Sequence, residues 1–110
     1  MEAKLNIYDG CESDQPIKTY ICRRLTYKVG VKIDTISNKI TKLQLEREKE
    51  NADLKAIDEE QYNLTIDLLK TIFPSFTNED FDGVDVIEYQ KFVNAIGHET
   101  SSILSQAAKN

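Results

Sequence analysis

The sequence predicts an α+β fold: a mainly α-helical small domain in which an N-terminal β-hairpin packs on about four helices. Two short segments near the N-terminus alternate apolar and polar residues, which is typical of strands. Through most of the remaining chain, apolar residues recur every three or four positions, which is typical of amphipathic helices. Residues that favour helix N-termini precede several of these stretches.

Length, charge and cysteine content limit the classes of function. With 110 residues, 40% of them hydrophobic, the chain can bury a core in one domain, expected at residues 1–104, with residues 105–110 as a frayed tail. The net charge of −5 opposes binding to nucleic-acid phosphates or anionic lipids, so neither is expected as a partner. No apolar run approaches the ~18 residues that a membrane-spanning helix needs. Cys11 and Cys22 are expected to be free thiols, because one bridge is sparse for a secreted domain that depends on disulfides.

The β-hairpin is expected over about residues 4–23. Residues 4–8 and 17–22 alternate, and a glycine and a proline lie in the polar connection between them. Leu5 and Ile7 share one face of the first strand, and Ile17, Thr19 and Ile21 share one face of the second. Because a lone hairpin is only marginally stable, this one is expected to cover a core.

The first helix is expected over about residues 27–50. Residues 25–33 fit both the strand period and the helical period. Their β-branched side chains and Gly30 favour a strand, whereas Thr26 as an N-cap and an apolar seam that continues to Leu43 favour a helix. We expect the helix, in which the glycine costs up to ~1 kcal/mol relative to alanine. The charged residues 46–55 are expected to form a solvated helix end or a mobile connection.

Three further helices are expected from their capping residues. A capping box of Asp58 and Gln61 opens a helix over about residues 58–73, which Pro74 ends. Thr77 and Asp80 cap a short helix at residues 77–82, which Gly83 ends. Asp85 and Glu88 form the same pattern at the start of a last helix, expected at residues 85–97 or longer, with Gly97 as a place where it can end or kink.

One segment is similar to the first half of a calcium-binding loop, because Asn78, Asp80 and Asp82 precede Gly83. The second half departs from the pattern, since Tyr89 stands where the bidentate acid belongs and Glu88 falls one residue short. The capping boxes explain the same acids without an ion, so no metal and no cofactor is expected. A calcium-responsive helix-loop-helix binding module is kept as an alternative function. No catalytic residues are expected, because no Ser or Cys is placed to use the single histidine, His98, and the chain is expected not to be an enzyme.

The order of these elements resembles that of a phage tail assembly chaperone, in the short form made by siphoviruses and prophages of Gram-positive bacteria. The match is carried by the Lys-Thr-Tyr run at residues 18–20 and by the Phe-Thr-Asn-Glu-Asp-Phe-Asp-Gly-Val-Asp run at residues 76–85. It covers nearly the whole chain through short motifs whose order is the informative feature. The glycine at position 30 and the charged insert at residues 46–55 depart from the usual pattern, and both bear on where the first helix begins and ends.

The resemblance implies a protein that binds the helical tape-measure protein before tail-tube assembly, keeps it soluble and helps to recruit tail-tube subunits. It also implies that the protein acts in the cytoplasm of the bacterial host and is absent from the mature virion. Such chaperones are typically made with a second, longer form by a ribosomal frameshift near the end of the short one, and Lys109 and Asn110 are compatible with an A-rich slippery codon pair.

Recognition of a helix is expected to use apolar stripes on this chain as a groove for an amphipathic target helix. The candidate partner-binding residues are Ile33, Ile36, Ile40, Leu43, Tyr62, Ile66, Leu69 and Phe73. The simpler interpretation is that all eight are core residues, since amphipathic stripes usually face their own domain. A homo-oligomer, and a small phage-encoded regulatory adaptor that binds another protein through the same stripes, are both kept as alternatives.

Overall fold

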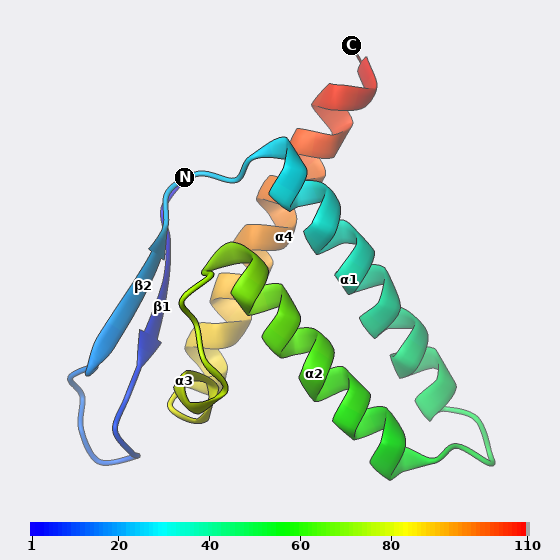
Figure 1. Cartoon of the computed structure of the whole chain (residues 1–110), viewed down its shortest axis with the longest axis horizontal. Helices are drawn as coiled ribbons and strands as arrows, with labels where there is room; N and C mark the ends of the chain where they lie inside the picture. The colour runs from blue at the N-terminus through cyan, green and yellow to red at the C-terminus, as the bar shows by residue number, and fades with distance from the viewer. Residues whose placement is uncertain (110) are drawn as a thin grey trace.

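The computed structural model describes residues 1–109 and contains a two-stranded antiparallel sheet followed by four helices (Figure 1). This is the predicted α+β class with an N-terminal hairpin. The elements are β1 (Ala3–Ile7), β2 (Lys18–Cys22), α1 (Tyr27–Arg47), α2 (Leu54–Ile72), α3 (Asn78–Asp82) and α4 (Val86–Lys109). Helices α1 and α2 form a helical hairpin, and α4 packs against both α1 and β1.

The β-hairpin covers the core with Leu5 and Ile7, the predicted apolar face of β1, but with a face of β2 that the alternation did not indicate. Leu5 pairs with Tyr20, and opposite residues of an antiparallel pair project to the same side of the sheet. Leu5 is therefore buried together with half-buried Tyr20 and buried Cys22. Ile17, Thr19 and Ile21 do share a face, but it is the outer one, with Ile17 67% exposed. The inward tyrosine also bonds to a carboxylate of the helical part, which the outward isoleucines could not do.

Helix α1 begins where the sequence predicts. Thr26 is its N-cap and accepts a hydrogen bond from the backbone N–H of Val29 at 3.3 Å. Residues 25–33, which fit both the strand period and the helical period, are therefore helical from Tyr27 onward. Gly30 is buried on the side of α1 that faces Ile103 of α4. The helix ends at Arg47, three residues before the predicted end.

Helix α2 begins earlier than predicted, at Leu54. Its N-cap is Asp53, which accepts from the backbone N–H of Ala56 at 3.2 Å. The predicted capping box of Asp58 with Gln61 is wrong, because Asp58 lies inside the helix and pairs with Arg47 of α1. Leucine, lysine and alanine at positions 54–56 are good helix formers, and burial of Ile57 stabilises the additional turn. The C-terminal end is as predicted, since Phe73 before Pro74 is extended.

The start of α3 is the predicted capping box. The Thr77 hydroxyl accepts from the Asp80 N–H at 3.1 Å, and the Asp80 carboxylate accepts from the Thr77 N–H at 3.0 Å. At the start of α4 the second box is half formed. Asp85 accepts from the Glu88 N–H at 2.9 Å, but the Glu88 carboxylate turns to the hairpin and accepts from the Tyr8 hydroxyl at 2.8 Å.

Helix α4 continues through Gly97 and reaches Lys109, so the predicted frayed tail at residues 105–110 is wrong for residues 105–109, and Asn110 lies outside the described residues. Two features explain the longer helix. Ile103 packs against the core at the N-terminal end of α1, which anchors the extra turns. In addition, no proline follows Gly97, and glutamine, alanine and lysine near the C-terminus are good helix formers.

The core lies where the β-hairpin meets α1, α2 and α4. Leu5 and Leu69 have 0% exposed surface, and Phe76, between α2 and α3, has 2%. The buried side chains form one cluster that joins both strands, the three long helices and the connecting segments. Leu43 and Ile57 are also buried but lie outside this cluster, near the closed end of the α1–α2 hairpin, which Figure 1 shows pointing away from the sheet.

Candidate functional site

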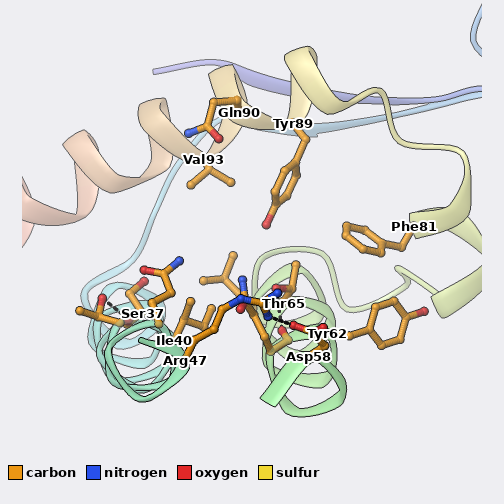
Figure 2. Close-up of a pocket in the computed structure, with 14 residues that line it drawn as sticks. Ser37, Ile40, Arg47, Asp58, Tyr62, Thr65, Phe81, Tyr89, Gln90 and Val93 are labelled. Carbon is orange, nitrogen blue, oxygen red and sulfur yellow. Dashed lines mark hydrogen bonds and ion pairs between the residues drawn. The ribbon is translucent and has the colours of Figure 1, made fainter. Parts of the chain in front are cut away.

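A groove of about 800 Å³ lies between α1, α2 and the N-terminal half of α4 (Figure 2). Apolar and aromatic side chains line much of it: Ile40, Tyr62, Leu68, Phe81, Tyr89 and Val93. Most of the other lining residues are uncharged and polar, among them Ser37, Thr41, Gln44, Gln61, Thr65 and Gln90. The volume lies in the range of protein ligand sites, and the lining is of the mixed apolar and hydrogen-bonding kind that such sites use.

The groove exists because α4 crosses above the α1–α2 hairpin instead of lying along it. In Figure 2, Tyr89 and Val93 project from α4 toward the other two helices, and Ile40 faces them from α1. Tyr89 and Val93 are both half-buried, so each is partly covered by the domain and partly open to the groove. From α4, Tyr89 and Gln90 stand four and three residues before Val93, which places each of them on the same side of the helix as Val93.

Three aromatic rings form a row at one side of the groove. The ring centroids of Tyr62 and Phe81 are 5.6 Å apart, and those of Phe81 and Tyr89 are 5.8 Å apart in an edge-to-face arrangement. Tyr62 remains 38% exposed. Burial raises the pKa of the Tyr89 phenol, although a hydrogen bond with Thr65 acts in the opposite direction. The Tyr89 phenol is therefore uncharged at neutral pH, and the row offers aromatic faces and edges to a bound group.

The charged residues that line the groove are an ion pair, Arg47 of α1 with Asp58 of α2. The two side chains are 45% and 57% exposed. A pair this exposed contributes about 0–1 kcal/mol to stability. Its consequence for the site is that the two charges offset each other, so the groove floor carries no net charge from these residues.

The eight predicted partner-binding residues divide between the core and this groove. Ile33, Leu43, Ile66, Leu69 and Phe73 are buried. Ile36 is half-buried and packs against the core cluster. Ile40 and Tyr62 line the groove. The structure thus brings two of the eight to a surface that a partner can reach without unfolding the domain.

Sequence reasoning missed the α3 and α4 side of the groove. Phe81 and Tyr89 have the spacing of hydrophobic staples, and Val93 has that of a core stripe, so local pattern assigned all three to packing. The crossing of α4 over the helical hairpin is a tertiary property that local spacing does not encode.

The acidic segment around α3 is used for packing. The Asp80 carboxylate accepts from the Tyr20 hydroxyl at 2.6 Å and from Lys18 Nζ at 3.2 Å, in addition to its capping bond. Burial by itself raises the pKa of Asp80, but these hydrogen bonds outweigh burial and lower that pKa. The Asn78 side chain accepts from Lys70 Nζ at 3.1 Å. Within residues 1–109 no group of three or more His, Cys, Asp and Glu is placed to hold a metal ion, so the calcium alternative gains no support.

Comparison of the chain with protein-family models, with curated proteins and with solved structures found no match in any of the three. In the described part of the chain, none of the helices combines the length and the apolar character that crossing a membrane requires.

Proposed function

We propose that this chain is a non-enzymatic phage tail assembly chaperone that binds a helical segment of the tape-measure protein in the groove between α1, α2 and α4. The observation that carries the proposal is the groove itself, which is lined by apolar side chains from three helices and open to solvent. An unfilled apolar surface of this kind is typical of a binding site rather than of a finished core. The order of the sequence motifs selects the tape-measure protein as the client.

Two exposed apolar side chains outside the lining lie on the faces of α4 and α2 that contribute to the groove. Val86, 81% exposed, stands three residues before Tyr89 and seven before Val93, on the same face of α4. Leu54, 48% exposed, stands four residues before Asp58, on the groove face of α2. An incoming helix could therefore contact apolar side chains over more than two turns, which is the pattern of helix-in-groove recognition.

The proposed work of the chaperone is to cover the apolar seam of its client until tail-tube subunits arrive. A free amphipathic helix exposes an apolar stripe that drives aggregation, and the groove replaces contact with water by contact with protein. The net charge of −5 helps to keep the complex dispersed. The chaperone would act in the cytoplasm of the bacterial host, pass the client to the tail-tube protein and be absent from the finished virion.

Co-expression tests the proposal. The client is the tape-measure protein encoded by the long helical reading frame that is expected downstream of this gene, and the measurement is the soluble fraction of a client fragment. We expect the wild-type chain to keep the fragment soluble. Tyr62→Ala should abolish most of this effect, because it removes an aromatic wall of the groove.

A matched control separates binding from folding. Tyr27→Ala removes a tyrosine that is 58% exposed and lies outside the groove lining, so it should leave the client soluble. Thermal unfolding of both variants checks that they fold. A client fragment that stays insoluble with the wild-type chain would contradict the proposal. The proposal would also be contradicted if the gene for this chain did not lie between the genes for the tail-tube protein and the tape-measure protein.

A further inference from the structure

The two edges of the β-hairpin differ in what they meet. At the edge of β1 that faces away from β2, the Tyr8 N–H donates to the Gly83 carbonyl at 2.7 Å, and Ile7 forms an isolated bridge with Val84. Within residues 1–109, β2 pairs with β1 alone. Figure 1 shows β2 at the margin of the molecule. The outer edge of β2 is therefore the free edge of the sheet.

The alternation of the backbone identifies the groups on this free edge. Successive residues of an antiparallel strand direct their N–H and C=O groups to opposite edges. Because Tyr8 bonds away from β2, Ile7 directs its groups toward β2, and so does its partner Lys18 toward β1. Thr19 and Ile21 stand one and three positions after Lys18, so their N–H and C=O groups point to the free edge. In the described part of the chain, no backbone hydrogen bond outside the hairpin uses these groups.

β2 has none of the features that usually protect an edge strand. Such strands are blocked by proline, by bulges or by charged side chains that point outward. β2 contains no proline, and its one charged side chain, Lys18, is held by Asp80 at 3.2 Å on the inner face. On the outer face, Ile17 is 67% and Ile21 is 38% exposed. An open edge of this kind can accept a further strand.

The two ends of β2 carry opposite charge. The connection before it, residues 8–17, contains the exposed acids Asp9, Glu12 and Asp14 and no lysine or arginine. Arg23 and Arg24 directly follow β2, and both are exposed. Among the described residues, none of these five side chains belongs to an ion pair. A strand with the same order of charges is complementary to β2 when it runs antiparallel, because its arginines then lie beside the acids.

We propose that the free edge of β2 pairs with β2 of a second copy of this chain, antiparallel about a two-fold axis at Tyr20, to form a four-stranded sheet. In this register, Thr19 of each copy lies opposite Ile21 of the other, so the outward backbone groups of both residues are satisfied. Arg24 lies opposite position 16 of the second copy, two residues from its Asp14. Because both the outward residues and the charged ends complement themselves, the edge selects a second copy over an unrelated strand.

A charge exchange tests the proposal, with sedimentation equilibrium as the measurement of mass. We expect the wild-type chain to dimerise with a Kd on the order of 10 μM, because a contact between two short strands is a small interface. Arg23→Glu with Arg24→Glu should weaken the dimer about tenfold or more, and so should Glu12→Lys with Asp14→Lys, because like charges then meet at both ends. An equimolar mixture of these two double variants should form dimers again.

A matched control separates the ends of β2 from net charge. Lys39→Glu with Lys42→Glu changes the charge by the same amount as the arginine variant, at exposed positions of α1. This control should dimerise like the wild-type chain. A mixture of the two complementary double variants that stays monomeric would overturn the proposal, and so would a control that dissociates as far as the arginine variant does.

A backbone variant tests the free edge itself. Thr19→Pro removes an N–H that points away from β1, so it should abolish the dimer and leave the hairpin intact. Circular dichroism checks that it folds, and the charge variants decide the question if it does not. A dimer that persists in folded Thr19→Pro would overturn the proposal, because the free edge would then not be the contact.

The outcomes are separate from those of the proposed function. A wild-type chain that is monomeric at ~0.5 mM would overturn the dimer and leave the groove available to its client. A dimer that Tyr62→Ala dissociates would also overturn this proposal, because the second copy would then occupy the groove instead of the sheet edge. Loss of client binding in Tyr62→Ala with the dimer unchanged would support two independent surfaces.

Discussion

At the scale of single residues, Gly83 allows the β-hairpin to pack closely against the α3–α4 turn. Its φ of −99° is open to any residue, so backbone freedom is not what requires a glycine here. The Gly83 carbonyl accepts from the Tyr8 N–H at 2.7 Å, and a Cβ on Gly83 would lie 2.4 Å from the Tyr8 carbonyl oxygen and 2.9 Å from Ile7 Cγ2. The glycine is needed because the end of β1 approaches the α3–α4 turn this closely.

Replacement of two glycines should have opposite effects on stability. Gly83→Ala should lower the free energy of unfolding by about 1–3 kcal/mol, because the backbones of β1 and the turn must separate. Gly97→Ala should raise it by about 0.5–1 kcal/mol, because a Cβ there meets no atom within 4 Å and helix formation costs less entropy. Urea denaturation measures both values. Similar effects of the two substitutions would contradict the role of close approach at Gly83.

Asp80 should make stability depend on pH. Its pKa is lowered in the folded state, so the stabilisation is complete above the unfolded-state pKa of about 4 and is lost as the pH falls through the folded-state value. Asp80→Asn should cost about 1–3 kcal/mol at pH 7, since charged hydrogen bonds from Tyr20, Thr77 and Lys18 become weaker or are lost. Urea denaturation between pH 7 and pH 2.5 should show the difference between the two proteins shrinking below about pH 4. A difference that does not change with pH would rule out this mechanism.

At the scale of elements, the α1–α2 connection shows how two capping signals compete. Asp53 and Asp58 are both able to begin a helix, and only Asp58 is followed three residues later by a side chain that can complete a capping box. The structure uses Asp53 because the additional turn buries Ile57. Burial of an isoleucine is worth about 1.5–3 kcal/mol, which exceeds the value of a capping side chain.

The two aspartates should therefore respond differently to truncation. Asp53→Ala should lower the free energy of unfolding by about 1 kcal/mol, because the Ala56 N–H loses its acceptor. Asp58→Ala removes one partner of an exposed ion pair and should cost about 0–1 kcal/mol. Thermal unfolding monitored by circular dichroism compares them. A larger loss for Asp58→Ala would favour the capping box that the sequence alone predicts.

The fold was more predictable from the sequence than the site was. Elements governed by local chemistry, such as the Thr77 capping box and the end of α2 before Pro74, were predicted correctly. The inward face of β2 was not indicated, because it depends on Tyr20 reaching Asp80, 60 residues further along the chain. The groove depends on the crossing of α4 over the helical hairpin, and only Ile40 and Tyr62 among the predicted residues line it. Local spacing carries no information about such long-range contacts.

At the scale of the whole molecule, stability is expected to be uneven. The core cluster draws on both strands and on the three long helices, whereas Leu43 and Ile57 are buried apart from it. The chain between Leu43 and Ile57 includes the exposed, highly charged connection at residues 48–53. The closed end of the helical hairpin is therefore held mainly by contacts between α1 and α2.

This end should open locally without global unfolding. Amide hydrogen exchange should report a lower free energy of opening for residues 44–57 than for residues 66–69, which lie in the core cluster. Leu43→Ala should speed exchange at the closed end and change exchange near Leu69 much less. Identical opening free energies in both regions would contradict the separation into two packed parts.

The tie between β1 and α4 has a consequence for synthesis on the ribosome. Tyr8, which directly follows β1, bonds to Glu88, 80 residues further along the chain, so β1 leaves the ribosome well before α4 does. A two-stranded ribbon alone is only marginally stable in water. Leu5 and Ile7 therefore stay uncovered until α4 has emerged from the ribosome, and a product released before that point would expose apolar side chains instead of forming a smaller folded unit.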